Sequence, residues 1–465
     1  MHLHFSIHYA SRWGQQLFIE TNHEKFAQIP LHYQADGWWQ ADLVVAHLPA
    51  GLQYNYVLRE ADGHERREAG KARALSGLKG RVVYLADSWR ELHHPDSALL
   101  NTAFTEVIFR PGQVRKAKAV RSQKGLAKVR FDFLQVRVPA GLELVVLGDV
   151  PELGNWQPAE AQVLAAEHFP LWQTQILLAP GTQFSYKYAL RDPETKEIVI
   201  WEQGDNRTYT VPAAADMVVK SDAYFRFAAG GWKGMGVAVP VFSLRSAQSC
   251  GIGEFMDLIP FVDWAADQGM QLVQILPIND TSSSFTWVDS YPYSAISVFA
   301  LHPIYLRVDQ LEVAPPKAAH QRTRTQLNAL AEVDYEAVLQ YKLKLARRAY
   351  DRQRSKLAKN KAFQSFVADN AHWLPAYAAF CYLRDQHATA DWLRWPAADQ
   401  NYDQERIDAL TAPTSAAYTE IAFHYYLQYH LDKQLYAAAS YARQRGIILK
   451  GDIPIGIDRE SADAW

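Results

Sequence analysis

Two tryptophans and three polar residues near the middle of the sequence have the types and spacing of a sugar-binding site. Trp156 occurs in LGDVPELGNWQPAEA and Trp201 in IVIWEQGDNRTYTVP, each at or after the end of an expected strand and close to a turn that can expose the ring. The C–H faces of a pyranose are apolar and stack on indole, while Lys187, Glu202 and Asn206 supply donors and acceptors for hydroxyl groups. Singly, each residue is better explained by core packing or solvation, but the set favours carbohydrate binding.

The composition is that of a globular chain rich in aromatic residues. The chain has 465 residues, 49% of them hydrophobic, a length that accommodates about two to four domains with their own cores. Phe, Trp and Tyr make up 12% of the residues, which fits both core packing and sugar binding. The 48 Lys and Arg nearly balance the 50 Asp and Glu, and no dense basic run is interleaved with aromatics, so we expect no nucleic-acid partner.

Motifs for other chemistries and for membrane insertion are missing from the sequence. No window approaches the roughly 18 uninterrupted apolar residues of a membrane span, and the alternating N-terminus is unlike a signal peptide. The two cysteines, Cys250 and Cys381, suit a reducing compartment and exclude a cysteine-rich zinc site. HExxH, the P-loop and a complete GxGxxG are absent. We therefore expect a cytoplasmic protein without a membrane partner, cofactor or metal; the oligomeric state is not predicted.

The first half of the chain is expected to contain two similar β-sandwiches, at residues 1–92 and 128–222. Short alternating segments such as LHFSIHY and LQYNYVLRE, separated by turn residues, predict strands. Residues 93–127 include the basic stretch RPGQVRKAKAVRSQKGLAK, which reads as a connector with a solvated face. The two blocks align with a one-residue loop difference, which indicates an internal duplication. The first set of matched residues is Tyr54, Tyr56, Leu58 and Arg59, and the second is Tyr186, Tyr188, Leu190 and Arg191.

The second half changes to a pattern of alternating strands and helices. From about Gly231, GVAVPVFSL and QLVQILPI are continuous apolar runs suited to strands buried on both faces. Between them, residues 257–268 have apolar residues at helical spacing and stop before Gly269, which completes a βαβ unit. Residues from about 315 to 445 are mainly helical, after which IILKG predicts a third strand.

The block at 128–222 resembles the starch-binding domains of carbohydrate-binding module family 20. It follows the family's order of LGxW, then YK, then WExxxNR. In that family two tryptophans with Lys, Glu and Asn bind α-1,4-glucan. The resemblance therefore implies a starch-binding site formed by five residues of this chain: Trp156, Lys187, Trp201, Glu202 and Asn206.

The block at 1–92 resembles the same family but departs from it at the site. Asn55 stands where Lys187 does, Arg67 occupies the position of Trp201, and no GNW follows FIETN. The end motif is kept only by Glu68 and Arg73. We expect this block to serve in packing; the alternative is a sugar site on other aromatic residues, such as Trp13 and Trp38.

Residues 231–310 and 446–465 resemble glycoside hydrolase family 77, the 4-α-glucanotransferases known as amylomaltases or disproportionating enzymes. GIGEFMDLIPFVDWAADQG, DSYPYSAISVFALHPIYL and GDIPIGIDRESADAW carry this resemblance. It implies a (β/α)₈ barrel with the site at the C-terminal ends of the strands. Asp280 and Asp452 follow two expected strands and would point into that site, with Tyr293 lining a sugar pocket and Ser290 beside it. The alternative for Tyr293 is a side chain that only packs in the core, and the alternative for Asp452 is a side chain that only caps a loop or helix.

The resemblances together imply a multidomain fold. Two immunoglobulin-like β-sandwich starch-binding domains are followed, at 223–465, by the first part of a (β/α)₈ TIM barrel with a large helical insertion. The implied function is 4-α-glucanotransfer between maltose, maltodextrin, starch or glycogen. The alternative is a non-catalytic α-glucan-binding protein; an α-amylase-like hydrolase is disfavoured by the tandem modules and the DSYPYS run.

The implied reaction is a retaining double displacement, which needs a nucleophile and an acid/base about 5–5.5 Å apart. In the family these carboxyl groups follow the motif with which this sequence stops, and no RIDH-like strand occurs in it. We therefore expect the nucleophile and the acid/base beyond Trp465, no catalytic residue within the chain, and no activity for residues 1–465 alone.

Overall fold

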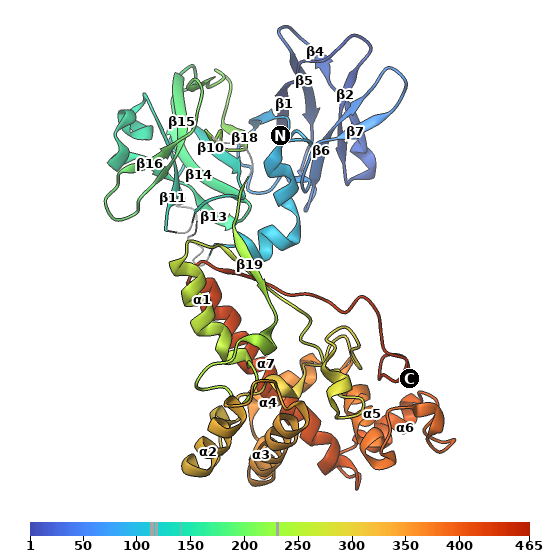
Figure 1. Cartoon of the computed structure of the whole chain (residues 1–465). Helices are drawn as coiled ribbons and strands as arrows, with labels where there is room; N and C mark the ends of the chain where they lie inside the picture. Colours follow the sequence, from blue (N-terminus) through green and yellow to red (C-terminus); the bar gives the residue numbers. More distant parts are fainter. Residues whose placement is uncertain (112–115, 117–119, 140, 229–231) are drawn as a thin grey trace. The chain divides into compact units, whose positions relative to one another are not determined.

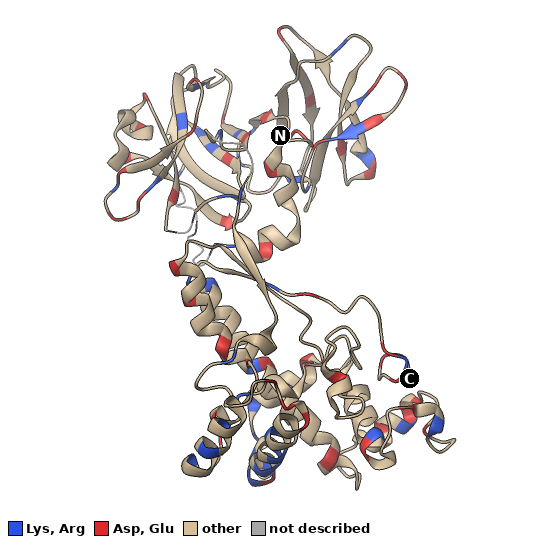
Figure 2. Cartoon of the chain, viewed as in Figure 1, with Lys and Arg blue, Asp and Glu red and all other residues tan. Residues whose placement is uncertain are grey.

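The computed structural model describes residues 1–111, 116, 120–139, 141–228 and 232–465 (Figure 1). The chain divides into two compact units, Met1–Lys233 and Gly234–Trp465. Residues 112–115 and 117–119 of the predicted basic connector, and Gly231 at the predicted start of the α/β region, lie outside the described residues. Acidic and basic residues are interspersed along both units (Figure 2). Among the described helices, none has the length and apolarity to cross a membrane.

The first β-sandwich of unit 1 is built from strands whose residues alternate between the core and the surface. On β1, Leu3, Phe5 and Ile7 are buried while the residues between them are more exposed. One sheet contains β1 (His2–His8), β4 (His32–Tyr33), β5 (Trp38–Val44) and β9 (Val82–Ser88). The other contains β2 (Gln16–Thr21), β3 (Gln28–Pro30), β6 (Gln53–Arg59), β7 (Glu65–Arg67) and β8 (Arg73–Ala74). Between this sandwich and the next, the predicted connector contains helical turns at Pro95–Leu100 and Ala103–Ile108.

The second β-sandwich has the same plan, with an aromatic core that includes a stacked pair, Phe133 and Tyr188, whose ring centroids lie 3.8 Å apart. One sheet contains β10 (Ala127–Leu134), β13 (Ala165–His168), β14 (Leu171–Leu178) and β18 (Met217–Ala223). The other contains β11 (Glu143–Gly148), β12 (Gln162–Val163), β15 (Gln183–Arg191), β16 (Ile198–Trp201) and β17 (Arg207–Thr210).

The two sandwiches share one continuous sheet, in the order β13-β14-β10-β18-β9-β1-β5-β4. At its centre β9 and β18 pair in parallel, with Val83 opposite Met217. Met217 and Val219 of β18 belong to the core of the first sandwich, whereas Val218 between them belongs to the core of the second. Because neighbouring residues of a strand point to opposite faces, the two cores lie on opposite faces of the shared sheet.

A buried polar network occurs once in each sandwich, as the predicted duplication requires. In the first, Arg73 pairs with Glu68 at 2.7 Å and with Asp87 at 3.1 Å, and the hydroxyl groups of Tyr54 and Tyr56 donate to Asp87. In the second, the corresponding residues make the same contacts: Arg207, Glu202, Asp222, Tyr186 and Tyr188. The network satisfies charges that would be costly to bury alone.

Unit 2 begins with parallel strands and continues as a helical domain. Its sheet has the order β19 (Gly236–Val239), β20 (Leu272–Ile275), β21 (Ile448–Lys450), all parallel. The helices are α1 (Leu258–Asp267), α2 (Lys317–Asn328), α3 (Tyr335–Leu357), α4 (Lys361–Asp369), α5 (Leu374–His387), α6 (Gln404–Thr411) and α7 (Tyr418–Gln444). The fold is thus a mixture of β-sandwiches and an α/β region; the eight-stranded barrel stays a prediction.

Candidate functional site

The outer face of the small sheet in the second sandwich carries one of the two predicted tryptophans. Trp201 ends β16 and lies opposite Ala189 of β15, while Lys187 of β15 lies opposite Leu147 of β11. Tyr188, between Lys187 and Ala189, points into the sandwich core. Lys187 and Ala189, with their cross-strand partners Leu147 and Trp201, therefore lie on the opposite face of the sheet, here called the outer face. Trp201 keeps 39% of its surface exposed, and its ring is therefore accessible to a ligand.

The second tryptophan is presented by a tight turn after β11. Trp156 ends a short helical turn, Pro151–Trp156, and packs against a small apolar cluster that includes Leu147 and Ala189. Gly154 in this turn has a φ of +78°, and a Cβ there would lie 2.8 Å from the Cβ of Glu160. A side chain at position 154 is therefore both strained and crowded, and glycine allows the turn that holds Trp156 on the outer face.

The polar residues of the predicted set divide into two groups. Lys187 is half-buried and donates from Nζ to the carbonyl of Gly204 at 2.7 Å, in the turn that follows β16. β15 and β17 are antiparallel, with Tyr186 opposite Arg207, the first residue of β17. Asn206, one residue before β17, therefore lies beside Lys187, one residue after Tyr186. Asn206 is exposed. These two side chains lie at the edge of the outer face and can reach a ligand there.

Glu202 differs from the other predicted residues because its carboxylate is buried, with an exposed fraction of 1%. It accepts hydrogen bonds from Arg207 at 2.9 Å, from Arg226 at 3.1 Å and from the amide of Tyr188 at 3.0 Å. Burial acts to raise the pKa of Glu202, but the hydrogen bonds and charge of the arginines outweigh it and the pKa lies below its ordinary value. Arg226 also donates to the Asp205 carbonyl; its part in this turn was not predicted from the sequence, because no motif links it to Glu202.

The equivalent face of the first sandwich carries charge in place of aromatic rings. Arg67 lies opposite Val57, as Trp201 lies opposite Ala189 in the other sandwich, and it forms an ion pair with Glu20 at 2.8 Å. The guanidinium of Arg59 lies 4.2 Å from the ring centroid of Phe18 and covers it. The alternative aromatic residues lie on other segments: Trp13, which is fully exposed, and Trp38, which begins β5.

In unit 2 the structure brings together two of the predicted substrate-binding residues. Asp452 follows β21, and Tyr293 donates from its hydroxyl to Oδ2 of Asp452 at 3.0 Å. This hydrogen bond raises the pKa of Tyr293. Both side chains are partly exposed, and Ser290, at the end of the short helical turn Trp287–Ser290, is exposed.

The expectation for Asp280 was wrong. Asp280 follows β20 as predicted, but it is 1% exposed, and its carboxylate accepts hydrogen bonds from the hydroxyl groups of Ser282 at 2.7 Å and Tyr377 at 2.6 Å. The position after a strand was predicted correctly. The partner Tyr377 on α5 lies almost a hundred residues away in the sequence and could not be predicted from it. Asp280 therefore joins the β20 loop to α5, and its carboxylate is closed off from solvent.

These features define a class of protein with a β-sandwich that presents an exposed tryptophan, Trp201, and a partly buried one, Trp156, together with a region of parallel strands and helices. Residues 126–221 match the family model "Starch binding domain", and residues 239–465 match the family model "4-alpha-glucanotransferase". The chain thus contains a domain of the glycoside hydrolase family 77 type, at residues 239–465, and a starch-binding domain of carbohydrate-binding module family 20, at residues 126–221.

Two curated relatives agree with these matches. The chain is 38% identical over 488 aligned residues to 4-alpha-glucanotransferase DPE2 of Oryza sativa subsp. japonica, an alignment that covers 99% of this chain and 51% of the rice protein. It is 37% identical over 234 residues to a 4-alpha-glucanotransferase of Chlamydia trachomatis, covering 50% of this chain and 42% of that protein. A solved amylomaltase from Streptococcus agalactiae in complex with acarbose aligns with a TM-score of 0.41 and 21% identity, over 50% of this chain and 46% of that one. The chain spans about half the length of the curated relatives it matches.

Proposed function

We propose that this protein is a 4-α-glucanotransferase that binds α-1,4-glucan on the second sandwich of unit 1 and contacts substrate through residues of unit 2. The observation that carries the proposal is the outer face with Trp156, Lys187 and Trp201, in a segment that matches starch-binding domains and precedes a glucanotransferase segment. The substrates are starch, glycogen, maltodextrin and maltose.

In this proposal the two tryptophans stack on glucose rings and the neighbouring polar groups bind hydroxyls. An ammonium group has three donors, so Lys187 can hold the Gly204 carbonyl and still donate to a sugar. The exposed amide of Asn206 supplies a donor and an acceptor. Glu202 is a positioning residue: its bonds to Arg207 and Arg226 fix the turn that follows Trp201. The first sandwich serves in packing, because its equivalent face is occupied by ion pairs.

In unit 2, Asp452 and Tyr293 are proposed to bind a substrate sugar as a pair. The hydrogen bond between them orients the carboxylate, and Ser290 lies exposed on a preceding turn. The chemical step is a retaining double displacement with two carboxyl groups about 5–5.5 Å apart, and we assign neither group to a described residue. Both cysteines, Cys250 and Cys381, are buried and free, which supports a place in the reducing cytoplasm.

The test is the product pattern from maltotriose incubated with the protein expressed from its own gene. Transfer gives glucose together with maltodextrins longer than maltotriose. Glucose and maltose without longer products would show hydrolysis and contradict the proposed reaction. Unchanged maltotriose, with amylose still bound, would contradict the transfer reaction and leave an α-glucan-binding protein as the function.

A further inference from the structure

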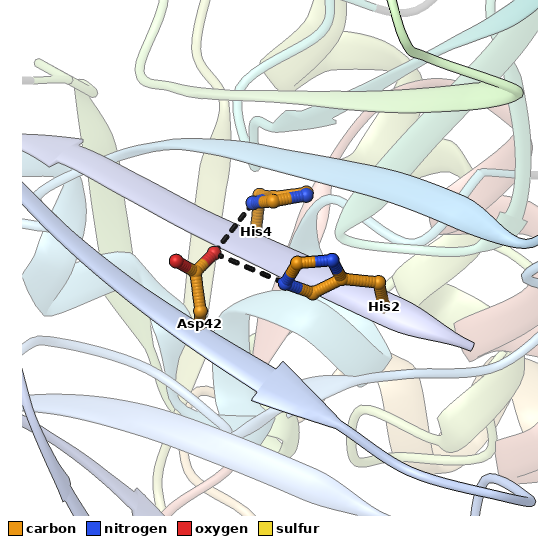
Figure 3. Close-up of side chains that lie close together, drawn as sticks. All are labelled: His2, His4 and Asp42. Atoms are coloured by element: carbon orange, nitrogen blue, oxygen red, sulfur yellow. Dashed lines mark ion pairs between the residues drawn. The ribbon is translucent and has the colours of Figure 1, made fainter.

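Two histidines and an aspartate meet on the surface of the first sandwich, away from the tryptophan face of the second. His2 and His4 are two residues apart on β1 and therefore share a face, opposite the buried Leu3 and Phe5. Asp42 of β5 lies directly across from His4 in the antiparallel ladder. Figure 3 shows both imidazole rings beside the Asp42 carboxylate.

The distances place three potential ligand atoms around one point. Nδ1 of His4 lies 2.5 Å and Nε2 of His2 lies 3.5 Å from the same oxygen, Oδ1 of Asp42. One ligand atom from each residue can be chosen so that all lie within 4.8 Å of one another. We propose that His2, His4 and Asp42 bind a divalent transition-metal ion of the zinc, nickel and copper class.

The donor set fits such an ion in number and in kind. Imidazole nitrogen and carboxylate oxygen are ligands of Zn²⁺, and imidazole also suits Ni²⁺ and Cu²⁺. A close contact between His4 and Asp42, at 2.5 Å, accounts for two of the three residues, whereas the contact of His2 at 3.5 Å is too long to be a good hydrogen bond. A metal ion engages all three. The side chains are partly open to solvent, so water completes the coordination.

The surrounding structure holds the ligands in place. The ring of His4 stacks on Tyr84 of β9, with centroids 4.4 Å apart and an interplanar angle of 13°. The rings of His2 and His4 lie 3.9 Å apart. β1 pairs with β5 along its whole length, from His2 opposite Val44 to His8 opposite Trp38. The site therefore needs little ordering on binding, which favours affinity.

Metal binding at this site has a structural consequence for unit 1. The ion joins β1 to β5 and fixes His4 against Tyr84, and Tyr84 packs against the core of the second sandwich. A ligand that binds the folded protein and not the unfolded chain raises the unfolding temperature by mass action. We therefore expect Zn²⁺ to stabilise unit 1.

The test is isothermal titration calorimetry of the untagged protein, freed of metal with a chelator, against Zn²⁺ and, in a separate experiment, against Ni²⁺. Wild-type protein is expected to bind one ion in a saturable manner. His4→Asn and Asp42→Asn are each expected to weaken binding by more than about tenfold, since loss of a ligand costs at least as much as the roughly 10- to 100-fold effect of losing an outer-shell partner. The matched control is His8→Asn, on the same face of β1 but opposite Trp38, which retains binding. No saturable binding in the wild type, or equal binding in all variants, overturns the proposal.

A measurement on the unaltered protein keeps the test valid if a variant fails to fold. Crystals of the wild-type protein soaked in Zn²⁺ are expected to show an anomalous scattering peak, at the zinc absorption edge, between His2, His4 and Asp42. Anomalous peaks found only at other positions would overturn the proposal.

Discussion

Replacing Trp201 by alanine is expected to weaken the binding of β-cyclodextrin without unfolding the protein. The ring is 39% exposed on the outer face, and its loss leaves the backbone pairing with Ala189 and the buried carboxylate of Glu202 in place. Loss of an aromatic stacking platform for nucleic-acid bases costs about 1–3 kcal/mol. On that scale the dissociation constant rises roughly 5- to 150-fold.

The assay is isothermal titration calorimetry of wild type and Trp201→Ala, with circular dichroism to establish that the variant is folded. Arg67→Ala is the matched control, because Arg67 occupies the equivalent position in the first sandwich and pairs there with Glu20. It is expected to bind β-cyclodextrin like the wild type. Unchanged affinity in a folded Trp201→Ala protein, or an equal loss in Arg67→Ala, would refute the assignment of the binding face.

Three further predictions concern the shared sheet, the tryptophan turn and a buried histidine. Val219→Ala removes buried methyl groups and their packing, which should lower the free energy of unfolding by about 2 kcal/mol. Because β18 contributes to both cores, calorimetry should show a single unfolding transition of unit 1, shifted to lower temperature. Two transitions, of which only one shifts, would contradict the shared sheet. Gly154→Ala places a Cβ 2.8 Å from the Cβ of Glu160 and should weaken β-cyclodextrin binding by displacing Trp156. The control is Gly181→Ala, where the added Cβ meets no atom within 4 Å and binding should be unchanged. Equal affinities in the two variants would contradict a role of the Gly154 turn in holding Trp156. Burial lowers the pKa of His424 from 6.5 to about 4. As the pH falls from 6.5 to 4 the unfolded chain is protonated at this histidine before the folded protein is, so the free energy of unfolding decreases by up to about 3 kcal/mol. Urea titrations should show a weaker dependence of this free energy on pH in His424→Gln, and the same dependence as in the wild type would contradict a buried neutral His424.

The sequence predicted the sandwiches well because their strands alternate and their turns contain typical residues. It did not predict that the sandwiches share a sheet, since β9 and β18 are far apart in the chain and parallel pairing leaves no local turn signal. One hint was available: Met217, Val218 and Val219 are consecutive apolar residues, typical of a strand buried on both faces.

The candidate site was predictable in residue types and less so in their individual roles. The motif around Trp201 identified the segment that matches the starch-binding family model. It did not predict that the buried carboxylate of Glu202 pairs with Arg226, which follows β18. Asp280 was assigned to a site from its place after a strand, and its actual partner Tyr377 belongs to a distant helix. The pairing of Asp42 with His4 follows from strand register, which sequence spacing does not fix.

The measurement that tests the account most directly is the nuclear magnetic resonance of the tryptophan indole N–H groups during titration with maltoheptaose. The account predicts that the signals of Trp156 and Trp201 shift together and saturate at the same glucan concentration, while that of Trp172, buried in the core of the same sandwich, stays in place. Shifts confined to other tryptophans, or the absence of any shift at saturating maltoheptaose, would contradict glucan binding on this face.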